Sequence, residues 1–272
     1  MGNLKNEEQY SNADESIVLI EGISMSDGVH RMFTLGNSGD THCIVNTKGK
    51  HKEGLKFLRK MCEDIVQRYS FDDLEISILD CVDLTVKRAM ASDYLAVGDP
   101  EIPINTFGVN ECKDAIEELC KQASARYVEL QNTGFRSVAD YNKDARCFSF
   151  DIMPRKLILI WAADILFKEK DTVTMNSLKY LEKIGRIIGI HLIYVIEDNS
   201  VVTDSDVNFL CKQCSLRFMV DTESPDECFV AKSYCDFLPA RYRISDLGTD
   251  RGKTHGTDVV ESASDILDGI EI

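Results

Sequence analysis

Two long apolar runs dominate the hydrophobic pattern of the chain. Residues 157–163 read Leu-Ile-Leu-Ile-Trp-Ala-Ala, and residues 190–196 read Ile-His-Leu-Ile-Tyr-Val-Ile. Runs of six or seven apolar residues without polar alternation are typical of strands covered on both faces, as in a parallel sheet with crossover helices. Residues 174–188 lie between the runs and are expected to form the crossover helix. The pattern therefore predicts two neighbouring central strands of a parallel sheet.

The same reasoning predicts further strands on either side of this pair. Apolar and β-branched residues between turn-forming segments indicate strands. We expect strands at residues 16–23, 42–46, 75–80, 102–109, 215–220 and 240–244. Residues 31–35 are expected to form a hairpin partner or an edge strand.

Helices are predicted between the strands, where apolar residues recur every three or four positions. Residues 55–69 form one amphipathic helix. Residues 111–131 form a longer one, whose inward side chains are expected to be Ala115, Leu119, Ala123 and Tyr127. Ser137 is expected to cap a half-helix within residues 134–142. Because strands and helices alternate, the chain is predicted to fold as a single doubly wound α/β domain over residues 16–248.

Polar segments flank this predicted domain. Residues 1–15 are polar and are expected to be disordered or loosely attached. Residues 249–272 are polar and Gly-rich, and they end in an acidic tail from residue 258. This tail is expected to be solvated, or to dock a short amphipathic helix onto the body or a partner. The apolar residues available for docking are Val259, Val260, Ile266, Leu267, Ile270 and Ile272.

Composition limits the classes of function. The formal net charge of the chain is -15, which disfavours sequence-independent nucleic-acid binding because such binding needs clustered Lys and Arg. The ten cysteines are scattered and no secretory signal precedes them, so reduced thiols and a cytoplasmic location are expected. No apolar stretch reaches the length of a spanning helix. Association with a membrane would therefore need a partner or another part of the chain.

Four short strings resemble those of one protein family. The first is residues 69–80, which begin Tyr-Ser-Phe-Asp-Asp-Leu and end with Asp80. The others are residues 125–130 (Ala-Arg-Tyr-Val-Glu-Leu), 138–142 (Val-Ala-Asp-Tyr-Asn) and 186–193 (Arg-Ile-Ile-Gly-Ile-His-Leu-Ile). In this order, the set resembles the motor domain of the FtsK/SpoIIIE family of hexameric RecA-like ATPases, which move DNA or, in type VII secretion, export small proteins. The resemblance implies a RecA-like (P-loop NTPase-type) α/β fold with a mostly parallel central sheet and helices on both faces.

The phosphate-binding loop of that family is altered in this chain. Its glycines let backbone amides approach the phosphates, its lysine reaches the β and γ phosphates, and its hydroxyl ligates Mg²⁺. The family's lysine position aligns with Glu53 and its hydroxyl position with Gly54. A carboxylate beside the γ phosphate would repel it by roughly several kcal/mol in a poorly hydrated loop. Alignments that use Gly49 with Lys50 or Lys52 place no Ser or Thr after the lysine.

The other motifs of the family are altered as well. Its acidic pair, which holds Mg²⁺ and polarises water, aligns with Trp161 and Ala162, while Asp164 lies slightly too far along the chain to replace it. The amide that senses the γ phosphate aligns with Glu197. The chain is therefore predicted to be a catalytically inactive pseudo-ATPase with no cofactor and no metal site.

The resemblance implies that such a domain acts by binding other proteins. The degenerate domains of type VII secretion ATPases serve recognition and regulation, so the expected partners are a second copy, active FtsK/SpoIIIE-type subunits or the signal peptide of a secreted substrate. An apolar groove near Trp161 and Ala162 is the expected contact. DNA is a disfavoured partner because of the net charge.

A divergent but active ATPase that drives DNA or protein translocation is the alternative. It would place Lys50 or Lys52 on phosphate and Asp80 or Asp164 near Mg²⁺. Either Arg186 or Arg217 would act across a subunit interface. This alternative requires ATP and Mg²⁺.

Two further groups of residues are interpreted as structural. Cys211 and Cys214 have the spacing of half a zinc site or of a redox pair, but no second close pair follows, so buried thiols are expected. His191 lies inside an apolar run and is expected to be a core histidine with a hydrogen-bonded ring.

Overall fold

The computed structural model describes residues 16–36, 40–70, 72–82, 104–197, 214, 216–220, 224, 227–231 and 239–244. Its strands are β1 (Ser16–Ser24), β2 (His30–Gly36), β3 (Cys43–Asn46), β4 (Leu74–Asp80), β5 (Ile104–Phe107), β6 (Arg155–Trp161), β7 (Ile190–Ile196), β8 (Leu216–Val220), β9 (Glu227–Ala231) and β10 (Ala240–Ile244). Its helices are α1 (His51–Arg68), α3 (Val109–Thr133), α4 (Val138–Phe148), α5 (Ala163–Glu169) and α6 (Thr172–Ile188). The predicted termini, residues 1–15 and 249–272, lie outside the described residues, as do Cys211 to Gln213.

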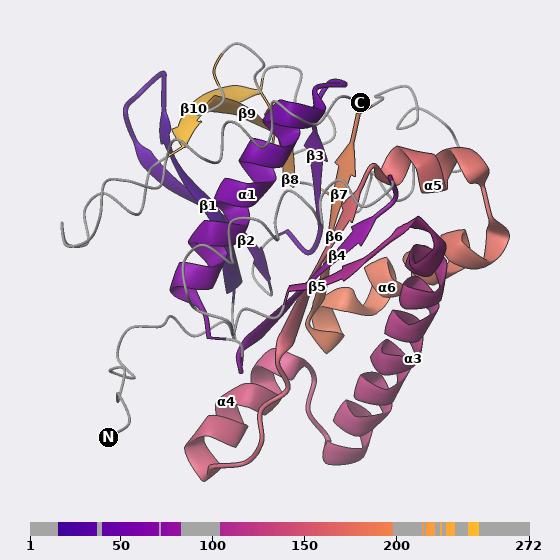
Figure 1. Cartoon of the computed structure of the whole chain (residues 1–272). Helices are drawn as coiled ribbons and strands as arrows, with labels where there is room; N and C mark the ends of the chain where they lie inside the picture. Colours follow the sequence, from indigo (N-terminus) through magenta and orange to yellow (C-terminus); the bar gives the residue numbers. More distant parts are fainter. Residues whose placement is uncertain are drawn as a thin grey trace, which may run out of the picture.

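The described strands form one sheet in the order β2-β1-β10-β9-β8-β3-β7-β6-β4-β5 (Figure 1). The strands from β8 to β5 pair in parallel, whereas β9, β10, β1 and β2 pair antiparallel. The two long apolar runs become β6 and β7, which pair in parallel from Lys156 opposite Ile190 to Ile160 opposite Tyr194. The predicted central strand pair and the mostly parallel sheet are therefore confirmed.

The register of the sheet decides which side chains share a face. Tyr194 of β7 pairs with Ile44 of β3, and Phe218 of β8 pairs with Val45. Successive residues of a strand point to opposite faces, so Tyr194 and Phe218 also lie on opposite faces.

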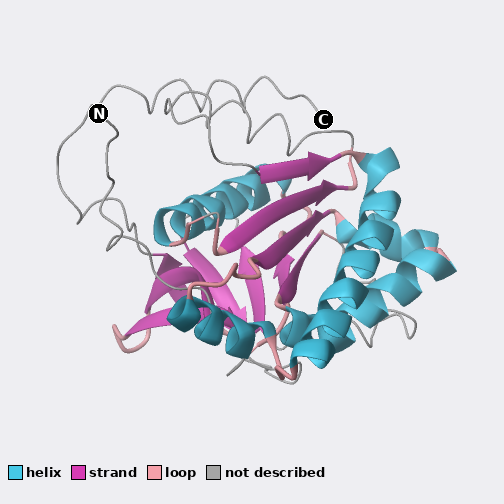
Figure 2. Ribbon diagram, turned by 90° about the horizontal axis from the view of Figure 1, so that it is seen from below, coloured by secondary structure: helices cyan, strands magenta, loops and turns pink. Residues whose placement is uncertain are grey.

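Helices cover both of these faces (Figure 2). Helix α1 packs on the face of Phe218, because the ring of Phe57 lies 5.6 Å from the ring of Phe218. Helix α5 packs on the other face, where the ring of Phe167 lies 5.6 Å from that of Tyr194. Helix α6 lies on this second face beside β7, and α3 packs against α6 and β4. The predicted layering of a sheet between helices is confirmed.

Local signals set two helix ends, and the predicted cap at Ser137 is confirmed. The Ser137 hydroxyl oxygen accepts a hydrogen bond from the Asp140 amide at 3.1 Å and so caps α4. Helix α6 ends at Gly189, which adopts the left-handed conformation with φ of 68°. Such a conformation favours glycine because a Cβ atom is disfavoured there.

Several sequence predictions are corrected by the structure. Tyr127 does not face inward: its side chain is 37% exposed, because the buried stripe of α3 runs through Ile116, Ala123 and Leu130 and leaves Tyr127 at its margin. The half-helix capped by Ser137 continues to Phe148. Strand β9 and helix α5 were not predicted. Among the described residues, no helix has the length and apolarity needed to cross a bilayer.

Candidate functional site

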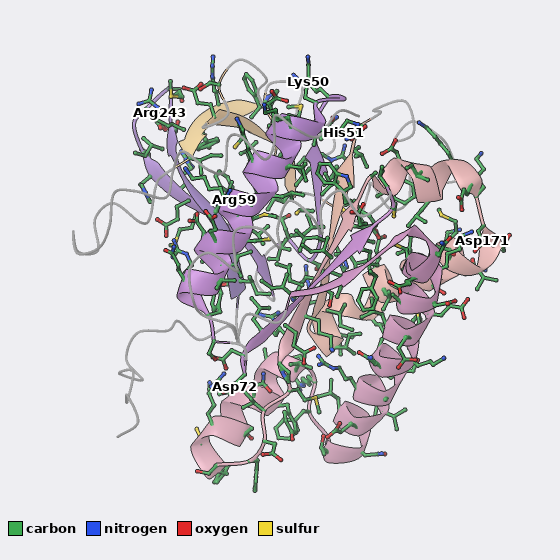
Figure 3. All side chains as sticks on the ribbon, viewed as in Figure 1. Lys50, His51, Arg59, Asp72, Asp171 and Arg243 are labelled. Carbon is green, nitrogen blue, oxygen red and sulfur yellow. The ribbon has the colours of Figure 1, made fainter. Side chains whose placement is uncertain are left out.

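The positions that sequence analysis aligned with the nucleotide site of the FtsK/SpoIIIE family lie along one edge of the sheet. Strands β3, β4, β6 and β7 are parallel, so their carboxyl ends meet at this edge, and α1 begins there directly after β3. Figure 3 labels Lys50 and His51 at this edge, above the strands. We call it the carboxyl edge. In open α/β sheets this edge is where ligands bind.

The loop between β3 and α1 is a tight turn. The Lys50 amide donates to the Thr47 carbonyl oxygen at 3.0 Å, and Lys48 and Gly49 have φ angles of 52° and 75°. Two positive φ angles inside such a hydrogen bond define a type I′ turn. The Thr47 amide donates to the last carbonyl of β7 at 2.9 Å, and the Lys48 amide donates to the last side chain of β3 at 2.8 Å. Three amides of the loop are thus bonded within the protein instead of converging on a phosphate.

Trp161 fills the space beneath the first turn of α1. A Cβ atom built on Gly54 would lie 2.4 Å from Thr47 Cγ2 and 3.2 Å from Trp161 Cη2. Real Cβ contacts are never as short as 2.4 Å, so residue 54 has room only for glycine unless Thr47 moves. The turn and the indole therefore leave no space for a side chain at residue 54, which sequence analysis aligned with the Mg²⁺-ligating hydroxyl of the family.

The end of β6 carries no acidic side chain. The side chains of Trp161 and Ala162 are 1% and 2% exposed, so both belong to the core. The prediction that they line an apolar groove is therefore wrong. Ala162 begins α5 in the left-handed conformation, with φ of 53°. That conformation costs a non-glycine residue about 1–2 kcal/mol. The surrounding packing must hold the sharp turn that follows the strand.

Two nearby aspartates are engaged within the protein. Asp164 Oδ1 accepts a hydrogen bond from the Glu197 amide at 3.3 Å, and its Oδ2 lies 3.5 Å from Lys168 Nζ. Asp80 lies opposite Trp161 in the sheet, is fully buried, and accepts a hydrogen bond from the Val82 amide at 3.0 Å. The structure brings both carboxylates to the carboxyl edge, where Asp164 joins β7 to α5.

Glu197 pairs with a residue that sequence analysis did not single out. Its Oε1 lies 2.5 Å from Nδ1 of His51, the first residue of α1, and the His51 ring lies 6.2 Å from the Trp161 ring. Burial raises the pKa of the Glu197 carboxyl group, the His51 interaction opposes that rise, and the Asp164 carboxylate adds to it. A contact between the Glu197 carboxyl group and the His51 ring thus connects the end of β7 to the start of α1 at the carboxyl edge.

The remaining candidates do not converge on this pair. Glu53 lies in the first turn of α1, and Lys50 and Lys52 are exposed. Arg186 is at the opposite edge of the sheet, where its Nε donates to Thr41 Oγ1 at 2.9 Å. Arg217 Nε donates to a backbone carbonyl just before β8 at 3.4 Å.

Two of the residues interpreted as structural, His191 and Cys214, are described, and both are buried. Nδ1 of His191 lies 2.7 Å from the Thr41 carbonyl oxygen, and the ring is fully buried, as predicted for a core histidine. Cys214 is buried as well. The described part of the chain contains no cluster of His, Cys, Asp and Glu suited to a metal ion.

Comparison with known proteins identifies the fold. No protein-family model and no curated protein matches the sequence. The cytoplasmic domain of the type VII secretion ATPase EccC of Thermomonospora curvata is similar, with a TM-score of 0.67 and 15% identity over 89% of this chain and 30% of that chain. ATPases 2 and 3 of the same EccC, in complex with a signal sequence peptide, are similar with a TM-score of 0.64 and 12% identity. That similarity covers 93% of this chain and 46% of that chain. The pCW3 conjugation coupling protein TcpA is similar with a TM-score of 0.59 and 10% identity, over 88% of this chain and 68% of that chain.

The chain thus spans less than half of the length of either EccC structure. At these identities the similarity concerns the fold. The resemblance predicted from the four sequence strings is confirmed at that level. The chain has the fold of the P-loop ATPase domains of FtsK-like secretion and conjugation motors.

Proposed function

We propose that this chain is a catalytically inactive FtsK/SpoIIIE-like domain that acts by protein–protein interaction, as a recognition or regulatory part of a type VII secretion or DNA-translocation motor. One observation carries the proposal. The indole of Trp161 occupies the end of β6 and contacts the first turn of α1, where a nucleotide-binding domain places a carboxylate, a hydroxyl and Mg²⁺.

The packing of this edge supports the loss of nucleotide binding. A serine at residue 54 would collide with Thr47, so the hydroxyl that ligates Mg²⁺ has no room. The amides of Thr47, Lys48 and Lys50 are bonded within the protein, so they are not available to surround a phosphate. Restoring any single motif would therefore leave the others obstructing the ligand.

Charge supports the same conclusion. Glu197 lies at the end of β7 and Glu53 in the first turn of α1, so two carboxyl groups border the region where a triphosphate would lie. Like charges close to one another in a partly buried site repel strongly because the effective dielectric constant is low. The His51 ring is already in contact with the Glu197 carboxyl group, so it does not need a phosphate group as its partner.

The proposed partners are proteins. One of the similar EccC structures is a complex with a signal sequence peptide, which makes such a peptide one candidate, together with a second copy and active motor subunits. The described surface carries two rigid aromatic side chains suited to a protein contact. Phe148 and Phe150 are 67% and 66% exposed, and their ring centroids lie 6.2 Å apart. The proposal includes a cytoplasmic location, with membrane association only through a partner.

The single tryptophan allows a direct test. Trp161 is the only tryptophan of the chain and contacts the nucleotide position, so its emission reports on ligand binding there. We expect neither a change in emission nor a rise in melting temperature when Mg²⁺-ATP or Mg²⁺-ADP is added to millimolar concentration. Mg²⁺ with sulfate at matched ionic strength is the control.

A saturable rise in melting temperature would contradict the proposal, because a ligand at one hundred times its Kd stabilises a folded protein by about 2.7 kcal/mol. If that rise were lost in Lys52→Ala, the chain would be a divergent ATPase that uses Lys52 on phosphate. Lys56→Ala is the matched control, since Lys56 is an exposed lysine one turn further along α1.

A further inference from the structure

Two cysteine side chains meet at the carboxyl edge. Leu79 of β4 lies opposite Phe107 of β5 in a parallel pair, so the chain leaves both strands from neighbouring positions of this edge. Cys81 follows β4 directly, and Cys112 belongs to the first turn of α3, which begins just after β5. The Cys81 thiol donates a hydrogen bond to the Cys112 sulfur at 4.0 Å. The sheet register thus brings together two thiols that are 31 residues apart in the sequence.

Both cysteines are held against the ends of the central strands. Cys112 is fully buried, and Cys81 is 3% exposed. Cys112 Sγ lies 3.4 Å from the Asp80 carbonyl oxygen, and the Cys81 amide donates to the Trp161 carbonyl oxygen at 3.1 Å. A side chain in the first turn of a helix points back toward the start of the helix, which directs Cys112 at β4. The pair therefore lies beside the ends of β4 and β6.

The two sulfur atoms are close enough to form a disulfide without a change of fold. A disulfide joins its sulfurs at about 2.05 Å, so the sulfurs of Cys81 and Cys112 need to approach by about 2 Å. Rotation of a cysteine side chain about its Cα–Cβ bond moves the sulfur over distances of this size. No strand and no helix has to shift its register.

We propose that Cys81 and Cys112 are a redox pair, which a hydroperoxide oxidises to a disulfide that joins the end of β4 to the start of α3. The pair is reduced in a reducing compartment, and its oxidation locks this part of the carboxyl edge. Disulfides of cytoplasmic proteins are usually transient and redox-sensing, which agrees with this role. The inference does not depend on the loss of ATP binding, because it concerns only the two thiols.

The reaction proceeds in two steps that balance. The Cys112 sulfur attacks one oxygen of hydrogen peroxide, so that an S–O bond forms, the O–O bond breaks and water leaves. The Cys81 sulfur then attacks the resulting sulfenic acid, so that the S–S bond forms, the S–O bond breaks and a second water leaves. Two thiols lose two electrons and two protons, and one peroxide is reduced to two waters.

The order of the two sulfurs follows from their surroundings. The hydrogen bond with Cys112 and burial both raise the pKa of the Cys81 thiol. Cys81 therefore keeps its proton at neutral pH and serves as the second, resolving thiol. Because both side chains are buried, the peroxide reaches them through local opening of the first turn of α3, and the reaction is slower than that of an exposed thiol.

Peptide mass spectrometry of the full chain tests the pair. The reduced protein is treated with excess hydrogen peroxide, then denatured with N-ethylmaleimide to block the remaining thiols, and digested. We expect a peptide with Cys81 linked to Cys112 in the monomeric species, and its loss after dithiothreitol. The bond closes a loop of about 30 residues, so oxidation should raise the melting temperature by roughly 10 °C, again reversed by dithiothreitol.

Two variants supply the specificity control. Cys112→Ala should abolish the rise in melting temperature, whereas Cys147→Ser should keep it, since Cys147 is exposed on α4. Circular dichroism verifies that each variant is folded. Recovery of Cys81 and Cys112 as N-ethylmaleimide adducts, from protein whose Cys147 has been oxidised, would overturn the proposal. Sulfinic acid at Cys112 without a link to Cys81, or a rise in melting temperature that persists in Cys112→Ala, would overturn it as well.

Discussion

Replacing Gly54 with alanine tests whether α1, the β3–α1 turn and Trp161 are packed as closely as the structure shows. In a helix interior, glycine is less favourable than alanine by about 0.8–1.0 kcal/mol, so the substitution alone would stabilise α1. The new Cβ atom, however, would lie 2.4 Å from Thr47 Cγ2 and 3.2 Å from Trp161 Cη2. Both neighbours are buried and cannot swing into solvent.

The magnitude follows from these opposing effects. Overpacking of a core by one methyl group costs about 1–3 kcal/mol, which exceeds the gain in helix propensity. We expect Gly54→Ala to lower the free energy of unfolding by about 1–2 kcal/mol, measured by urea denaturation with Trp161 fluorescence. Lys56→Gly, at an exposed position of α1, measures the propensity term in the same helix and should cost about 1 kcal/mol.

A second substitution removes the obstructing atom. Thr47→Ser deletes Cγ2 and keeps the hydroxyl that donates to the Ile196 carbonyl at 3.4 Å. In the double variant, Gly54→Ala should be neutral or stabilising, with a coupling free energy of about 1–2 kcal/mol between the two positions. A single Gly54→Ala variant that is as stable as the native protein would refute the close packing, and with it the argument that residue 54 has no room for a Mg²⁺-ligating hydroxyl.

Substitutions at three other positions test the core. Burial raises the pKa of Glu182 to about 9, and the nearby Tyr194 side chain opposes that rise, so the group is protonated in the folded state and ionised in the unfolded chain above about pH 4.5. Stability should therefore fall as pH rises from about 4.5 to 9, and Glu182→Gln should gain at least about 1 kcal/mol on the native protein between pH 5 and pH 8 in urea titrations. A constant difference would contradict the buried carboxyl group. Asn142→Ala should cost about 2–4 kcal/mol in the same assay, because the amide donates to the Met153 carbonyl at 2.9 Å and accepts from the Met153 amide at 2.8 Å in the core. A loss under 1 kcal/mol would show that water replaces both bonds. Trp161→Ala should lower the free energy of unfolding by about 3–5 kcal/mol, measured by thermal and urea unfolding with circular dichroism. Trp161→Phe should lower it less, because Phe keeps most of the volume and removes a buried indole N–H that has no acceptor among the described residues. Equal losses in the two variants would contradict that order.

The buried strands were predictable because their signal is local. Residues 190–196 are apolar throughout, and a strand that is covered on both faces has no other surface on which to place polar groups. The cap at Ser137 and the glycine that ends α6 at Gly189 are also local, since each satisfies or relieves the backbone within a few residues. These features need no knowledge of distant contacts.

Other features depended on neighbours that are remote in sequence. The inward face of α3 is set by its packing against α6, and this excludes Tyr127 although the spacing of Tyr127 suits the stripe. Strand β9 has only five residues, Glu227–Ala231, and pairs with β8 and β10 on its two sides, so its extended conformation is stabilised by the sheet more than by its own sequence.

The sequence alone determined which residue types stand at the positions of the nucleotide site: Glu53, Gly54, Trp161, Ala162 and Glu197. Residue type follows directly from alignment with the family's strings, and the functional meaning of those positions stays a prediction. Only the tertiary structure decided what these residues do to one another. It placed the Trp161 indole beneath the first turn of α1 and paired Glu197 with a histidine. It also buried Ala162 in the core, where no groove was left for a partner. Packing and ion pairing act over a few ångströms between groups far apart along the chain, and the sheet register that brings them together is a property of the whole fold.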